Sequence, residues 1–140
     1  MPEATRPGGR IRVIVGTDPA AGGDIMEVVP AGVQWRLISA RAGLATDVTV
    51  INRVVRLICD DGVNSFALLE SNYNQPDSLT MSYTFADVSL RGVGLGEAVI
   101  SGIPAGMILG PGFRFFTSTI GLQAGDNWGA PSFMVEEWPA

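Results

Sequence analysis

Very few residues of this sequence could do chemistry, and their types exclude most catalytic designs. The 140 residues contain no histidine and a single cysteine, Cys59. Without histidine there is no general base for a serine or cysteine nucleophile and no imidazole ligand for a metal. Cys59 lies on the apolar face of a predicted strand, which is typical of a buried, unreactive thiol. These features predict a protein that is not an enzyme and carries no metal or cofactor.

Two pairs of adjacent carboxylates, Asp60-Asp61 and Glu136-Glu137, are the next candidates for acid–base chemistry. Neighbouring side chains on a strand point to opposite faces, so neither pair can flank one bond as a glycosidase pair does. Asp61-Gly62 instead has the composition of a tight hairpin turn. The glycines of Gly92-x-Gly94-x-Gly96 lack the spacing and the following helix of a phosphate-binding loop, so we interpret them as a flexible or bulged crossing.

The charge distribution limits the classes of partner. All nine basic residues are arginine, and fourteen carboxylates give a net charge of −5. The arginines are spread from Arg6 to Arg114 without a run, which argues against nucleic-acid binding. The most apolar stretch, 98–113, is interrupted by glycine and proline, so no membrane-spanning helix fits. The polar first ten residues lack the apolar core of a signal peptide, so we expect synthesis in a cytoplasm.

The periodic segments are dominated by β-branched residues and predict an all-β fold, because no window of twelve residues keeps helical spacing. The length and the 46% apolar composition fit one domain with one core. We expect eight or nine strands bounded by turns such as Pro30-Ala31-Gly32. The expected strands are 11–15, 25–29, 33–40, 49–59, 63–69, 79–85, 97–103, 113–120 and 132–138.

This number of strands in one domain predicts a β-sandwich, with a jelly roll as the favoured topology. We assign 11–140 to the sandwich, 1–10 to an extended N-terminal arm, and 70–78 to a surface loop. A faint internal repeat is compatible with two Greek keys, although such patterns also recur by chance. Its two copies run from Pro30-Ala31-Gly32 through Trp35-Arg36 to Asp47, and from Pro111-Gly112 through Phe113-Arg114 to Asp126.

Five residues belong to segments with few local partners, so we predict that they contact a partner protein. They are Arg6, Arg10, Trp128, Glu136 and Trp138. The two arginines belong to the arm, and arginine pairs well with carboxylates across interfaces. Trp128 lies in a glycine-rich loop, as an exposed anchor for a sugar or protein pocket or as a lid on one end of the sandwich. Trp138 is expected to dock on its own sheet or on a neighbour.

Two stretches of the chain resemble small virion proteins of tailed bacteriophages. The first comprises Val28-Val29-Pro30-Ala31-Gly32, Trp35-Arg36-Leu37, Thr46-Asp47, Val50 and Asn52-Arg53. The second comprises Ile103-Pro104-Ala105-Gly106, Leu109-x-Pro111-Gly112 and Gln123-Ala124-Gly125-Asp126. In size and composition the chain is similar to the jelly-roll cement, or decoration, proteins of short-tailed phages such as those infecting Bordetella.

That resemblance implies a symmetric homodimer, or alternatively a homotrimer, on the outside of an icosahedral capsid, where it clamps neighbouring major capsid protein subunits. It implies a place on the virion capsid surface after synthesis in the host cytoplasm, and it implies no catalysis. A second interpretation stays open, namely a carbohydrate- or receptor-binding β-sandwich of a phage tail or another surface assembly. That module would use Trp128 or Tyr73 as a platform for stacking on a sugar ring.

Overall fold

Strands and turns make up the computed structural model, which describes residues 9–86, 92–93, 98–104 and 106–140. These residues form an all-β sandwich of two sheets without a helix, as the sequence predicted. The strands are β1 (Arg10–Val15), β2 (Met26–Val28), β3 (Val33–Ala45), β4 (Arg53–Asp60), β5 (Ser65–Gln75), β6 (Thr80–Ala86), β7 (Gly92–Val93), β8 (Ala98–Gly102), β9 (Ile108–Leu109), β10 (Arg114–Ile120), β11 (Asn127–Trp128) and β12 (Ser132–Pro139).

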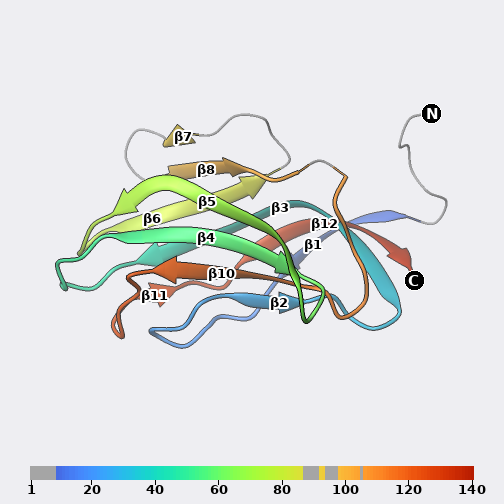
Figure 1. Cartoon of the computed structure of the whole chain (residues 1–140), viewed down its shortest axis with the longest axis horizontal. Coiled ribbons are helices and arrows are strands. Elements are labelled where there is room, and N and C mark those ends of the chain that lie inside the picture. The colour runs from blue at the N-terminus through green and yellow to red at the C-terminus, as the bar shows by residue number, and fades with distance from the viewer. Residues whose placement is uncertain (1–8, 87–91, 94–97, 105) are drawn as a thin grey trace.

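The larger sheet has the strand order β1-β12-β3-β6-β8-β7, with β9 and β11 also paired to β3. The smaller sheet has the order β2-β10-β4-β5. The chain therefore crosses from one sheet to the other at each step from β1 to β4, as Figure 1 shows. Among the described residues β6 and β8 pair in parallel, and the other pairs are antiparallel.

The core lies between the sheets because each long strand turns alternate side chains inward. On β4 the inward residues Val55, Leu57 and Cys59 are buried. Phe115 of β10 meets Phe133 of β12 edge to face, with ring centroids 5.1 Å apart, so the aromatic contact joins the two sheets. Among the described residues, all buried apolar side chains except Trp138 belong to one cluster.

The nine expected strands correspond to β1–β6, β8, β10 and β12, with shifted ends. The three further strands have two residues each, too short for an alternating pattern to be visible. The expected strand 49–59 begins only at Arg53, because side-chain hydrogen bonds hold the preceding residues in a loop. The expected loop 70–78 is wrong over most of its length, since β5 continues to Gln75.

The N-terminal arm is corrected at its boundary. Arg10 is the first residue of β1 and lies opposite Glu137 of β12, so it belongs to the sheet and not to an arm. The rest of the predicted arm, Arg6 included, falls outside the described residues except for Gly9.

The connections gather at two ends of the sandwich (Figure 1). We call one the loop end, comprising residues 16–25, 46–52, 76–79 and 121–126. Backbone hydrogen bonds tie these segments together, from Gly22 N to Asp126 O at 2.7 Å and from Ser78 N to Asp47 O at 2.8 Å. We call the other the hairpin end, comprising residues 29–32, 61–64 and 110–113. The C-terminus joins it, because Ala140 N donates to Gly32 O at 2.9 Å.

Candidate functional site

Trp128, which the sequence assigned either to an exposed anchor or to a lid on one end of the sandwich, is buried. Its ring is 1% exposed and packs against Tyr83 with centroids 5.6 Å apart. Its Nε1 donates to Asp24 Oδ1 at 3.3 Å. The pairing of β11 with β3, which places Trp128 opposite Leu44, turns the indole into the core. The prediction of an exposed anchor is therefore wrong, and this side chain is no platform for a sugar ring.

Two other predicted contact residues lie at the hairpin end and are also buried. Trp138 docks on its own sheet opposite Gln34, and Gly9 approaches so closely that an added Cβ would lie 2.5 Å from Trp138 Nε1. Glu136 forms an ion pair with Arg36, with 3.1 Å between Oε1 and Nε. Trp138 therefore takes the first of its two expected positions, on its own sheet, and Glu136 is used in an ion pair within the sheet.

Glu137, which the sequence interpretation considered only as half of an adjacent carboxylate pair, accepts several hydrogen bonds near the hairpin end. It accepts hydrogen bonds from Trp35 Nε1 at 2.9 Å, Arg12 Nη1 at 2.8 Å and Arg10 Nη2 at 3.1 Å. The hydrogen bond from Trp35, supported by the two arginines, lowers the pKa of Glu137 despite its burial. Arg10 thus remains exposed but is tied to the C-terminal strand.

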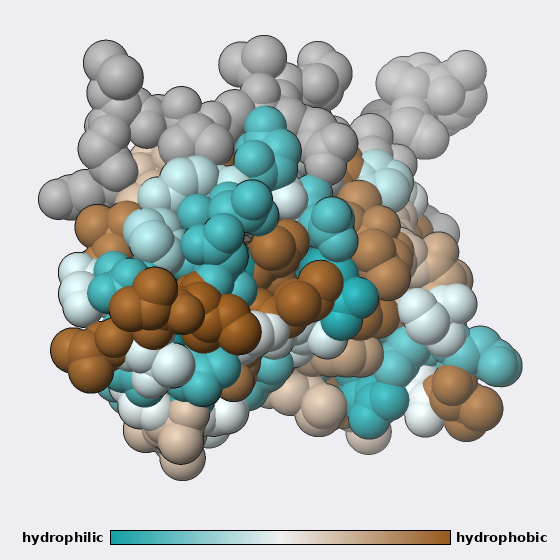
Figure 2. Space-filling model, turned by 60° about the vertical axis from the view of Figure 1, so that its left-hand side comes forward, coloured by the Kyte–Doolittle hydropathy of each residue, from teal (hydrophilic) through white to brown (hydrophobic). Residues whose placement is uncertain are grey.

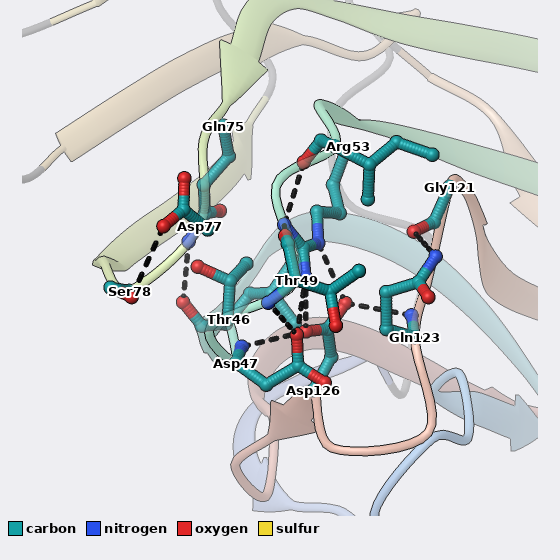
Figure 3. Close-up of polar contacts among 12 residues, drawn as sticks. Thr46, Asp47, Thr49, Arg53, Gln75, Asp77, Ser78, Gly121, Gln123 and Asp126 are labelled. Atoms are coloured by element: carbon teal, nitrogen blue, oxygen red, sulfur yellow. Dashed lines mark hydrogen bonds and ion pairs between the residues drawn. The ribbon is translucent and has the colours of Figure 1, made fainter.

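The most completely bonded polar group lies at the loop end (Figure 3). Arg53, the first residue of β4, is fully buried. Its Nε and Nη2 donate hydrogen bonds to the two carboxylate oxygens of Asp126, each at 2.9 Å. Nη2 also donates to Asp47 Oδ1 at 2.8 Å. Nη1 donates to the backbone oxygens of Thr49 at 2.9 Å and Ile51 at 2.6 Å. All five guanidinium N–H donors are therefore used.

Asp126 completes this network from the opposite side. Besides the guanidinium, it accepts the backbone N–H groups of Asp47 and Gln123, each at 2.8 Å. Burial alone would raise the pKa of Asp126, but the hydrogen bonds from Arg53 and from the two backbone groups outweigh it and lower that pKa. The hydrogen bond to Asp126 in turn raises the pKa of Arg53. The pair is thus ionised on both sides, and it fixes the loops 46–52 and 121–126 to each other.

The arrangement has a consequence for the surface of the loop end. Because Arg53 draws the carbonyl groups of Thr49 and Ile51 inward, the loop holds apolar side chains outward. Val48 is 80% exposed, Val50 86% and Ile51 43%. Figure 2, with this end turned toward the viewer, shows hydrophobic side chains at the surface among hydrophilic ones.

The sequence interpretation missed this network because Arg53 and Asp126 are 73 positions apart. One signal pointed toward it. The two copies of the faint internal repeat end at Asp47 and Asp126, and both carboxylates bind the same guanidinium. The repeat therefore marked two of the three charged members, without the arginine that joins them.

A shallow groove of about 340 Å³ opens on the outer face of the larger sheet. The polar part of its wall comes from Arg41, Thr80, Ser82 and Ser132, and Arg41 Nε donates to Ser82 Oγ at 3.0 Å. Its lining contains no aromatic residue. Tyr73, the other predicted platform, packs partly buried against the core. The groove can therefore offer hydroxyl and guanidinium groups to a ligand but no ring for stacking on a sugar.

Cys59 is a buried thiol, as predicted. It is fully covered on β4, and burial, aided by the neighbouring Asp60, raises the pKa of Cys59 to about 11. The adjacent carboxylate Asp60 is held by Arg114, whose Nε and Nη2 donate to its two oxygens at 2.8 and 2.6 Å. That hydrogen bonding lowers the pKa of Asp60. Asp61 Oδ1 accepts the backbone N–H groups of Val63 and Asn64, which confirms the hairpin turn.

Within the described ranges, no three histidine, cysteine, aspartate or glutamate residues are placed to hold a metal ion. No helix in the same part of the chain is long and apolar enough to cross a membrane. Comparison with known proteins found no matching family model and no matching curated relative.

Proposed function

We propose that the protein is a structural component of a phage virion that binds the outside of an icosahedral capsid and stabilises contacts between major capsid protein subunits. The observation that carries this proposal is the strand order. When the two-residue strands and β8, which pairs with β6 in parallel, are left out, one sheet reads β1-β12-β3-β6 and the other β2-β10-β4-β5. This order supports a jelly roll, an architecture found in viral capsid proteins, lectins and cupins.

The fold alone does not distinguish a capsid protein from a lectin or a cupin. The chemistry of the exposed residues favours the first. A metal-dependent cupin needs a histidine cluster, and the chain has no histidine. A lectin stacks sugars on exposed aromatic rings, whereas Trp128 is buried, the groove has no aromatic residue, and the half-exposed Phe66 packs against Phe113. A capsid-binding protein needs only a stable scaffold with an exposed contact surface, which the loop end supplies. The carbohydrate- or receptor-binding module is therefore the less supported alternative.

Stabilisation of a shell needs no chemistry beyond selective binding. A protein that binds the assembled lattice better than free subunits shifts the equilibrium toward the lattice, and many weakly bound copies suffice. In this role the partners are the major capsid protein and a second copy of the same chain in a homodimer, with a homotrimer as the alternative. Closed symmetry of this kind is the rule for soluble oligomers.

Quantitative mass spectrometry of purified particles from the source tests the proposal by counting copies of this chain per major capsid protein. Hundreds of copies in a near-integral ratio are expected. A handful of copies would place the protein at a tail or a single vertex and contradict the shell role. Its absence would favour the carbohydrate-binding alternative. Light scattering distinguishes two from three copies of the 14.7 kDa chain in solution.

A further inference from the structure

The loop end combines a rigid backbone with exposed aliphatic side chains, and this combination requires an explanation. A fully buried arginine with two carboxylates is costly to desolvate, and in some proteins such pairs specify one conformation. Here the specified conformation is that of the loop 46–52, whose carbonyl groups bind Arg53. Of the side chains that this loop turns to solvent, Val48 and Val50 have little cover within the described chain and Ile51 is partly covered.

The charges around this surface indicate what covers it. The four segments of the loop end contain five aspartates and no arginine: Asp18, Asp24, Asp47, Asp77 and Asp126. Asp47 lies in the apolar loop itself, and Asp77 lies in the neighbouring segment that is bonded to it through Ser78. Asp126 is fully buried, and the buried Arg53 forms ion pairs with both Asp126 and Asp47, so that one cation that does not reach the surface faces two carboxylates. The apolar side chains are therefore bordered by negative charge.

A second copy of this end is a poor occupant, because two identical faces would bring aspartates against aspartates. Like charges that face each other across an interface cost affinity, whereas complementary charges speed association and fix the register. We propose that the loop end is the docking surface for a capsid subunit whose contact face has an apolar centre and a rim of lysine or arginine. This inference rests on the proposed capsid role and adds which end of the sandwich faces the shell.

The test uses particles that lack this protein, titrated with the purified full chain. The variant is Val50→Asp, and the matched control is Val63→Asp, which changes an equally exposed valine at the hairpin end, 85% against 86% exposed. Neither side chain is part of the core, so both variants should keep the wild-type melting temperature. The Val50→Asp variant should bind the particles about ten-fold more weakly or worse, because it loses one buried aliphatic contact and adds a charge. The Val63→Asp variant should bind as the wild type does.

A second measurement tests the charged rim. Asp77→Asn should weaken binding at low salt, and the difference from the wild type should shrink as salt screens the charges. Stronger binding by Asp77→Asn would overturn the basic rim. Light scattering must show that Val50→Asp keeps the oligomeric state of the wild type, because dissociation would identify a second copy as the occupant.

The outcomes separate this inference from the proposed function. If the wild type binds particles and Val50→Asp binds equally well, the capsid role stands and the docking surface is wrong. If Val63→Asp loses as much binding as Val50→Asp, the loop end is not selective and the inference also fails. If the wild-type protein does not bind particles, the proposed function is wrong, and the docking surface, which depends on it, is wrong as well.

Discussion

At the loop end, Asp126 holds a guanidinium that has no contact with water, whereas at the hairpin end Glu137 holds two guanidiniums, one of them 68% exposed. Both carboxylates are themselves buried, and both have a lowered pKa. The difference lies in the arginines. Arg53 has replaced all of its water contacts with protein acceptors, while Arg10 and Arg12 keep part of theirs.

This contrast shows that a carboxylate–arginine pair can either fix a loop from within the core or link neighbouring strands near the surface. At the loop end the pair joins segments far apart in the sequence and decides the shape of an exposed loop. At the hairpin end the arginines of β1 and the indole of Trp35 on β3 converge on β12 between them. Burial of the cation, more than the length of the hydrogen bonds, should decide how much each carboxylate contributes to stability.

The largest effect is expected from Asp126→Ala. It leaves the buried Arg53 without its main acceptor, and removal of one partner of a buried ion pair typically costs about 3–5 kcal/mol. Urea denaturation measures the free energy of unfolding. Asp18→Ala is the control, since it removes an exposed aspartate of the same end and should change stability by less than about 0.5 kcal/mol. A loss from Asp126→Ala as small as that of the control would remove the contrast between the two ends.

Glu137→Ala should come second, at about 1–3 kcal/mol, because it leaves the buried Trp35 Nε1 without an acceptor while the two arginines can return to water. Glu137→Gln sharpens this comparison, since its amide oxygen still accepts from Trp35 and only the charge is lost. In the same urea experiment, the free energy of unfolding of Glu137→Gln should therefore lie between that of the wild type and that of Glu137→Ala. Equal losses for Gln and Ala would show that the charge matters at this end more than the acceptor.

Acid should lower the free energy of unfolding by less than either alanine variant does. A protonated carboxyl group loses its charge, but its oxygens can still accept hydrogen bonds. Unfolded carboxyls take up protons near pH 4, while Asp126 and Glu137 have lowered pKa values in the folded protein. Their stabilisation is present above about pH 4 and is lost as the pH falls through the folded values. Urea unfolding between pH 7 and 3 measures the decline, which should be shallower in Asp126→Asn. A decline of equal steepness in that variant would contradict the role of Asp126.

The smallest effect is expected from Arg10→Ala, which removes an exposed partner of Glu137. Exposed ion pairs contribute about 1 kcal/mol or less and are screened by salt. Thermal or urea unfolding at low and at high salt measures the difference. A loss that is large and independent of salt would mean that Arg10 contributes through packing of its stem and not through charge.

The strands could be predicted because their signal is local. Strand 79–85 alternates apolar and hydroxyl residues, and β6 turns Met81, Tyr83 and Phe85 into the core as that pattern requires. The second half of β5 shows where a local signal fails. Its outward positions hold Asn72 and Asn74, which suggested a loop, while the inward Gln75 is satisfied by accepting from Tyr83 and donating to the carbonyl group of Leu44.

The candidate site could not be predicted, because its members meet only after the sheets have formed. Arg53 alternates in phase with the inward residues Val55, Leu57 and Cys59, so periodicity places it on the covered face. Its partner Asp126 lies beyond β10, and nothing in the sequence connects the two. Trp128 failed for the same reason, since its glycine-rich surroundings gave no hint of the pairing with β3 that buries it. Sequence periodicity reports which face of a strand is covered, but it does not report what lies across the core.

Cys59 gives the protein an internal reporter of its own opening. A thiol that is covered on both sides, and that stays protonated to about pH 11, reacts with an alkylating reagent only when β4 separates from the opposite sheet. Because it is the one cysteine in the chain, each alkylated molecule records a single kind of event. The rate of labelling under native conditions would therefore report how often the two sheets separate, both in the free protein and in the protein bound to a partner.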